Sequence, residues 1–231
     1  MPTAFEHSLA AAIKDCEGWC SAEKACALAK IIREERLSRV LEIGVFGGKS
    51  LLAIALAQSN AELPDAITVG VDPWRVYDCV EGESNPANVD WWSNVEMLHT
   101  VHRKCMEALW SAGVIDRVIV LRNSSVAAAS FLATHEWDLI HIDGNHSELS
   151  SMRDVQLWFP RLRAGGVLVF DDIDWSSTNK AVQLIEEQTE LLFEVNKCRF
   201  YRKPGPLTVT SNGSAPSRRT RRKPSLAPVA Q

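Results

Sequence analysis

The 231-residue sequence lacks an apolar run long enough to cross a membrane, and its first residues do not have the pattern of a secretory signal. A transmembrane helix needs roughly 18 or more consecutive apolar residues, and no stretch approaches that length. The first twelve residues contain Glu6 and His7, without the basic segment and apolar core of a signal peptide. These absences predict a soluble, cytoplasmic protein.

Paired cysteine motifs are missing as well. The sequence contains no Cys-x-x-Cys pair and no cysteine–histidine spacing typical of a zinc site. In a domain of this size the cysteines are therefore expected to be reduced thiols, which agrees with a cytoplasmic location. The six are Cys16, Cys20, Cys26, Cys79, Cys105 and Cys198.

Basic residues are scarce in most of the chain. Residues 1–203 carry 20 basic and 29 acidic side chains, whereas residues 204–231 carry five basic side chains and no acidic one. An acidic body lacks the basic face that phosphate contacts require, so we expect no nucleic-acid partner. Residues 204–231 are rich in proline, serine and arginine and are predicted to be a disordered basic tail.

The rest of the chain alternates between short apolar runs and helical patterns, which predicts an α/β, doubly wound, mostly parallel sheet at residues 38–203. Residues 1–37 have a helical pattern with a break at Gly18 and form a predicted helical cover. Strands are predicted at 40–43, 66–72, 117–121, 137–143 and 167–170, with a terminal antiparallel pair at 191–195 and 199–202. Helices are predicted at 50–59, 89–112, 126–132, 147–159 and 178–189, and a loop at 162–166.

The segment Val40 to Ser50 has the pattern of a buried strand, a glycine turn and the start of a helix. Gly44, Gly47 and Gly48 lack a Cβ atom, so a ligand can lie against the backbone of the turn. The helix that begins near Ser50 directs free N–H groups at the same place. The spacing matches neither the P-loop nor Gly-x-Gly-x-x-Gly. The turn therefore predicts a nucleotide-like site of another kind.

Acidic residues stand at the carboxyl ends of three predicted strands: Asp72, Asp143 and the pair Asp171-Asp172. Parallel strands bring those ends to one edge of the sheet. Clustered carboxylates resist ionisation without a compensating cation, and oxygen ligands favour Mg²⁺, Ca²⁺ or Mn²⁺. We predict a metal site at Asp143, Asp171 and Asp172. The alternative is that some of these acids only cap the helices that follow.

Other polar residues near the strand ends are candidates for binding a nucleotide-like cofactor in the glycine turn. Asp72 ends the second strand, where a carboxylate can accept hydrogen bonds from ribose hydroxyls. Glu42 is predicted to orient the cofactor's amino group or an N–H group of the turn. Ser124 and Ser125 follow the third strand and are predicted to lie at the adenine end.

Two histidines have different expected roles. His146 lies three residues after Asp143, in the turn before a helix, where a neutral imidazole beside a metal-bound hydroxyl can act as a general base. A structural role in the turn is the alternative. His141 lies within the fourth strand and is predicted to be a packed or hydrogen-bonded core residue.

Residues 73–90 are predicted to be irregular, and the segment around them is rich in aromatic side chains. We predict that Trp74, Arg75, Trp91 and Trp92 form a lid over the pocket for the second substrate. The alternative is that these aromatic side chains pack against the sheet.

Four ordered motifs resemble the class I S-adenosylmethionine-dependent methyltransferases. They are EIGVFGGKS at 42–50, GVDPW at 70–74, IDGNH at 142–146 and GGVLVFDD at 165–172. The motifs are most similar to the small family that includes the macrocin-type sugar O-methyltransferases. The resemblance spans residues 38 to 175. It implies a seven-stranded sheet with S-adenosylmethionine over the first turn, Mg²⁺ held by Asp143, Asp171 and Asp172, and a base at His146. Family members often carry Glu-Asp in place of Asp171-Asp172, a difference that can alter the metal geometry.

The expected function is therefore methyl transfer from S-adenosylmethionine to a hydroxyl of a sugar or small polyhydroxylated molecule, assisted by Mg²⁺. Asp143 and His146 are the expected catalytic residues. One alternative is a metal-independent methyltransferase in which the acids only hydrogen-bond the acceptor. Another is a non-catalytic cofactor-binding scaffold whose basic tail docks on an anionic partner. Both the Mg²⁺-assisted and the metal-independent methyltransferase are compatible with assembly into a homo-oligomer.

Overall fold

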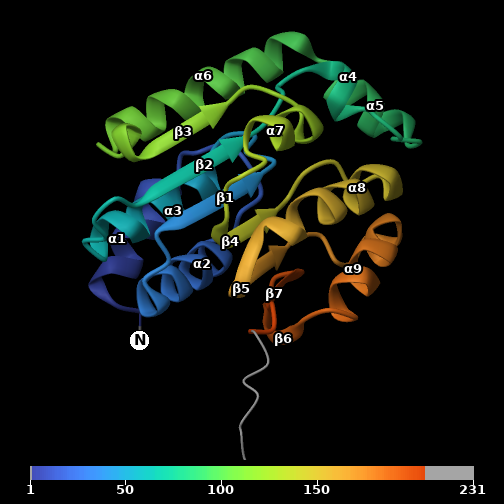
Figure 1. Ribbon diagram of the computed structural model, residues 1–231. Helices are drawn as coiled ribbons and strands as arrows, with labels where there is room; N and C mark the ends of the chain where they lie inside the picture. The colour runs from blue at the N-terminus through green and yellow to red at the C-terminus, as the bar shows by residue number, and fades with distance from the viewer. Residues whose placement is uncertain (1, 206–231) are drawn as a thin grey trace, which may run out of the picture.

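The computed structural model describes residues 2–205, which form a seven-stranded sheet in the order β3-β2-β1-β4-β5-β7-β6 (Figure 1). The first five strands pair in parallel, and β7 pairs antiparallel with both β5 and β6. The strands are β1 (Arg39–Ile43), β2 (Ile67–Val71), β3 (Val118–Leu121), β4 (Trp137–Ile142), β5 (Leu162–Phe170), β6 (Glu190–Val195) and β7 (Cys198–Arg202). The predicted fold class is confirmed. The predicted tail at 204–231 lies outside the described residues, except for Pro204 and Gly205.

Helices cover both faces of the sheet, and each face has its own apolar core. One face is covered by α1 (Ala4–Ile13), α2 (Ala22–Glu35), α3 (Lys49–Asn60) and α6 (Val95–Ser111). The other is covered by α7 (Ser125–Phe131), α8 (Glu148–Trp158) and α9 (Asn179–Glu186). Short 3₁₀ helices are η1 (Ile115–Arg117), η2 (Phe159–Arg161) and η3 (Ser176–Thr178). Because helices bury both faces, β1, β2 and β4 consist mostly of buried apolar residues.

The helical cover is held by helix caps and by an apolar face. Thr3 caps α1, and its side chain accepts a hydrogen bond of 3.2 Å from the backbone N–H of Glu6. Ser21 caps α2 and accepts a hydrogen bond of 3.1 Å from the backbone N–H of Lys24. Leu28 on α2 is fully buried against the sheet layer. The docking of α2 therefore fixes the side chains of its first turn relative to the strand ends.

Two segments differ from the prediction. Residues 162–166, predicted to be a loop, belong to β5, with a register shift where β5 meets β4 between Trp137 and Leu139. Gly165 takes a φ of 72°, which allows this irregular start of the strand. Residues 73–90, predicted to be irregular, contain α4 (Val76–Cys79) and most of α5 (Pro86–Trp92). The side chain of Asn85 caps α5, and a proline, Pro86, occupies the first position of the helix.

No helix within residues 2–205 is both long enough and apolar enough to cross a bilayer. The six cysteines all lie in this range, and none of them forms a disulfide. Figure 1 shows α4 and α5 together beside one end of α6, on the side toward which the arrows of β1 and β2 point. The segment that was predicted to form a lid therefore stands at the carboxyl ends of the strands.

Candidate active site

A cavity of about 930 Å³ lies at the carboxyl ends of the parallel strands. Its lining comes from the turns after β1, β2, β3, β4 and β5, and from residues 17–24 between and within the first two helices. Ligands of open α/β sheets bind at this edge, outside the carboxyl ends of the strands. The volume is near the upper end of the range for single-ligand pockets, roughly 300–1,000 Å³.

The glycine turn after β1 is shaped by close contacts between chain segments. Gly44 has a φ of +87°, and a Cβ atom there would lie 1.9 Å from the backbone oxygen of Asp143. A Cβ atom at Gly47 would lie 2.3 Å from the backbone oxygen of Glu17. The missing side chains therefore let protein backbone approach the turn, where the sequence suggested the approach of a ligand.

The predicted cofactor-binding residues fall into two groups. Five of them line the cavity: Gly44, Ser50, Asp72, Ser124 and Ser125. Glu42, Gly47 and Gly48 are not among the lining residues. Gly48 instead caps α3 with a φ of 80°, a conformation that favours glycine.

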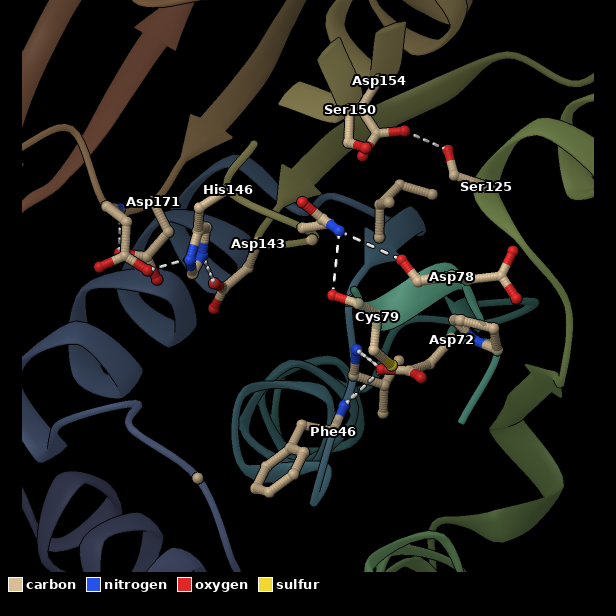
Figure 2. A pocket seen from close by; sticks show the side chains of 18 of the residues that line it. Phe46, Asp72, Asp78, Cys79, Ser125, Asp143, His146, Ser150, Asp154 and Asp171 are labelled. Carbon is tan, nitrogen blue, oxygen red and sulfur yellow. Dashed lines mark hydrogen bonds and ion pairs between the residues drawn. The ribbon is translucent and has the colours of Figure 1, made fainter. Parts of the chain in front are cut away.

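Asp72 fixes the conformation of the glycine turn. Its Oδ2 accepts hydrogen bonds from the backbone N–H groups of Val45 at 3.0 Å and Phe46 at 2.8 Å (Figure 2). Its Oδ1 accepts a hydrogen bond of 2.8 Å from the backbone N–H of Trp74. A carboxylate has about four acceptor positions, so about one of them, on Oδ1, remains for the predicted ribose contact.

The two serines after β3 line the cavity, and Ser125 lies at another corner of it (Figure 2). Ser124 caps α7 by accepting a hydrogen bond of 3.3 Å from the backbone N–H of Ala127. The hydroxyl of Ser125 bonds to Asp154 Oδ1 and accepts a hydrogen bond of 2.7 Å from Trp158 Nε1. Burial raises the pKa of Asp154 to about 7. Asp154 was not among the predicted site residues, although Asp154 and Trp158, four residues on, share the buried face of α8.

Two of the three predicted metal ligands, Asp143 and Asp172, lie together beside His146. His146 Nε2 lies 2.9 Å from Asp172 Oδ2 and 4.0 Å from Asp143 Oδ1. These three residues offer ligand atoms that all lie within 4.8 Å of one another. Burial alone would lower the pKa of His146, but its contacts with Asp143 and Asp172 raise the pKa to about 9. The ring is therefore protonated near neutral pH in the protein without ligands.

Asp171 faces Lys24, which was not among the predicted site residues. Lys24 Nζ lies 3.0 Å from Asp143 Oδ2 and also forms an ion pair with Asp171 Oδ2. Burial opposes the charged form of Asp143, yet the ammonium of Lys24 holds the pKa of Asp143 well below its usual range. The available signal was the position of Lys24 one turn before Leu28, on the buried face of α2.

Behind this cluster, His141 and Glu42 form a buried pair. His141 Nδ1 lies 2.8 Å from Glu42 Oε1, and both side chains are fully buried. The prediction of His141 as a hydrogen-bonded core residue is confirmed. His141 Nε2 points toward the cluster, 4.0 Å from Asp143 Oδ2 and 3.9 Å from Asp171 Oδ2. Glu42 therefore holds the His141 ring that faces the acidic cluster, and it does not contact the cavity.

Aromatic side chains form one wall of the cavity. The rings of Trp19 and Phe46 stack with centroids 5.0 Å apart, and Trp91 lies 5.8 Å from Phe46 and 4.6 Å from Trp92. All four residues line the cavity. We call this set, Trp19, Phe46, Trp91 and Trp92, the aromatic wall. Trp74 differs: it is buried and its Nε1 donates a hydrogen bond of 2.9 Å to the backbone oxygen of Phe46.

The two neighbouring residues of the predicted lid, Trp74 and Arg75, lie in different surroundings. Arg75 lines the cavity, whereas Trp74 is absent from its lining and packs into the core. Trp175, which was not among the predicted site residues, lies beside His146 with ring centroids 4.8 Å apart and the rings tilted by 47°. Arg75, Trp91 and Trp92 thus border the cavity, while Trp74 follows the packing alternative.

A seven-stranded sheet with this strand order, and a cavity over the turns after β1 and β2, define the Rossmann-like methyltransferase class. The chain belongs to the methyltransferase-domain family, whose match covers residues 41–173. No curated protein matches the sequence significantly.

Solved structures with the same fold cover nearly the whole chain. Cofactor-bound Rv0187 from MTB is 19% identical with a TM-score of 0.60, over 89% of this chain and 92% of that one. The O-methyltransferase TomG from Streptomyces achromogenes, in complex with SAM, is 17% identical with a TM-score of 0.60, again over 89% and 92%. The methyltransferase PaMTH1 from Podospora anserina, bound to SAH, is 17% identical with a TM-score of 0.61, over 89% of each chain. At these identities the likeness shows the fold.

Proposed function

We propose that this methyltransferase transfers the methyl group of S-adenosylmethionine to a hydroxyl of a small molecule. The family match supports methyl transfer, and TomG, which has the same fold, is an O-methyltransferase that binds SAM. The resemblance to the macrocin-type enzymes supports a sugar or a small polyhydroxylated acceptor. The aromatic wall is compatible with such an acceptor, because tryptophan rings pack against the apolar faces of sugars as well as against aromatic rings.

The cofactor is proposed to extend from the serines after β3 to the acidic cluster after β4. The free acceptor position on Asp72 Oδ1 would bind a ribose hydroxyl, and Ser124 and Ser125 would border the adenine. The cavity of about 930 Å³ has room for an acceptor beside the cofactor. Figure 2 shows Asp143, His146 and Asp171 together at one end of this cavity, apart from Asp72 and from the Ser125–Asp154 pair.

The observation that carries the proposal is the placement of His146 in the cavity between two carboxylates. The sulfonium methyl of the cofactor is already activated, so the protein mainly has to align an acceptor oxygen with it. His146 in its neutral form would take the hydroxyl proton. Asp143 and Asp172 orient the ring, and Trp175 packs beside it.

The resemblance also implies Mg²⁺, which would lower the pKa of the acceptor hydroxyl. The predicted ligands fit such an ion only in part. Asp143 and Asp172 lie within 4.8 Å of each other together with His146, a set with two hard oxygen ligands. Asp171, however, is paired with Lys24, which also uses Asp143 Oδ2. The ammonium of Lys24 already supplies a positive charge between Asp143 and Asp171. The proposed reaction therefore uses only side chains of the protein. The same observation favours the metal-independent alternative.

Binding and turnover test the proposal in sequence. Calorimetry with S-adenosylmethionine, with and without Mg²⁺, is expected to show cofactor binding. A screen of hexoses, inositol and catechol then follows methyl transfer by the wild type and by His146→Ala. We expect His146→Ala to bind the cofactor normally and to lose about 10²-fold or more in kcat. His99→Ala, on the exposed face of α6, is the control. Absence of cofactor binding would refute the proposal, and methylation of catechol alone would refute its sugar-like acceptor.

A further inference from the structure

The ammonium group of Lys24 lies between two of the carboxylates that the sequence assigned to a metal ion. Lys24 Nζ is 3.0 Å from Asp143 Oδ2 and forms a second ion pair with Asp171 Oδ2. The side chain of Lys24 is 5% exposed and that of Asp171 is 8% exposed, so both charges are shielded from water. Buried carboxylates require a compensating cation, and here an internal side chain provides it.

The position of Lys24 is set by the fold. Lys24 lies in the first turn of α2, where the positive end of the helix dipole disfavours a cation. Leu28, one turn later on the same face, is fully buried and anchors the helix. A buried lysine at a helix N-terminus is stable here because Asp143 and Asp171 face it.

A second set of possible metal ligands lies near Lys24, on the buried side of the cluster. His141, Asp171 and Cys198 have ligand atoms within 4.8 Å of one another, and all three residues are buried. A divalent ion shared by Asp143 and Asp171 would have to displace the ammonium or lie beside it, and like charges repel strongly in a buried site.

We propose that Lys24 is the fixed cation of the reaction centre in place of a divalent metal ion, and that methyl transfer needs no metal. The proposal rests on the methyltransferase function given above. In the step, a lone pair of the acceptor oxygen bonds to the methyl carbon while the carbon–sulfur bond breaks. Its electron pair goes to sulfur and yields S-adenosylhomocysteine, and the hydroxyl proton goes to the neutral His146 imidazole. Lys24 acts through Asp143, which contacts His146, so it is a positioning residue.

Metal affinity tests this role without relying on turnover. Mn²⁺ alone is titrated into the full chain, and the signal of the free aquo ion is followed by electron paramagnetic resonance. Lys24→Met removes the ammonium but keeps most of the stem, and it frees oxygens of Asp143 and Asp171. We expect Lys24→Met to bind Mn²⁺ about tenfold tighter or more than the wild type. Equal affinity in the two proteins would overturn the proposal.

Two variants make this comparison specific. Lys30→Met lies on the exposed face of the same helix, where Lys30 Nζ is 4.0 Å from Glu34 Oε1, and it is expected to bind Mn²⁺ like the wild type. Lys24→Arg keeps the positive charge and is expected to bind Mn²⁺ as weakly as the wild type. If Lys24→Met does not fold, the wild-type titration still decides, because low-micromolar Mn²⁺ binding there would overturn the proposal.

Turnover gives a second, separable result. With an acceptor from the hexose, inositol and catechol panel, wild-type methyl transfer is expected to be unchanged by EDTA and by added Mg²⁺. Loss of activity in EDTA and its recovery with Mg²⁺ would overturn the role of Lys24 while confirming methyl transfer. Absence of methyl transfer under every condition would instead refute the proposed function, and the Mn²⁺ comparison would still report on Lys24.

Discussion

Replacing Asp154 by asparagine is expected to stabilise the protein at alkaline pH but not at acidic pH. Asp154 lies on α8 at 5% exposure, and its contact in the cavity wall is the hydroxyl of Ser125. Burial raises the pKa of this carboxyl from 3.8 to about 7. An asparagine has nearly the same shape, can accept the same hydrogen bond from Ser125, and never ionises.

The magnitude follows from linkage between protonation and folding. Because the folded pKa of Asp154 is raised, its contribution to stability is complete below pH 3.8 and is lost as the pH rises to about 7. Between pH 5 and pH 8 the unfolded chain is ionised throughout, whereas the folded chain loses its proton near pH 7. The free energy of unfolding therefore falls only between pH 5 and the folded pKa of about 7. Over these two pH units, at about 1.4 kcal/mol each, the wild type becomes about 3 kcal/mol less stable.

Thermal unfolding at pH 5 and pH 8 measures this effect. A domain of this size shifts its Tm by about 2–4 °C per kcal/mol, so the gap between Asp154→Asn and the wild type should grow by about 6–12 °C from pH 5 to pH 8. Asp90→Asn, at an exposed position on α5, is the control and should show no such change. A gap for Asp154→Asn that is the same at both pH values would show that the buried carboxyl does not titrate as argued.

Four further predictions concern the site. Gly44→Ala would place a Cβ atom 1.9 Å from the backbone oxygen of Asp143 at a residue whose φ is +87°. Unfolding in urea should therefore show a loss of about 3 kcal/mol or more in the free energy of unfolding. Stability equal to that of the wild type would contradict this reasoning. Asp72→Asn turns an amide N–H₂ toward backbone N–H groups of the glycine turn, and calorimetry should show roughly tenfold weaker S-adenosylmethionine binding. Because His146 must be neutral to accept a proton and its pKa is raised to about 9, kcat/KM is expected to rise with pH up to about pH 9; a flat profile from pH 6 to pH 9 would exclude His146 as the base. Trp19→Ala removes one ring of the aromatic wall and should raise the acceptor KM by up to about tenfold with little change in kcat, whereas a change in kcat alone would argue against a binding role.

Local patterns in the sequence were sufficient to predict the order and type of the strands and helices. Short apolar runs separated by helical periodicity predicted the existence of every strand and, except at the start of β5, its bounds to about one residue, because parallel strands covered on both faces must be apolar. Placing acids at the carboxyl ends of those strands also predicted that Asp143 and Asp172 would meet beside His146. The start of β5 was missed, since its bulge against β4 depends on the pairing partner and leaves no periodic pattern.

The tertiary structure decided what those residues contact. Lys24 is 119 positions away from Asp143 in the chain, and only the docking of α2 brings the two together. Gly47 is needed because the backbone of Glu17 passes beside it, and Ser125 meets Asp154 only where α7 and α8 pack. Sequence spacing records which residues share a strand end or a helix face, and this was enough to predict a cluster of carboxylates. It does not record which helix supplies the opposite charge, because that depends on how separate elements pack across the edge of the sheet.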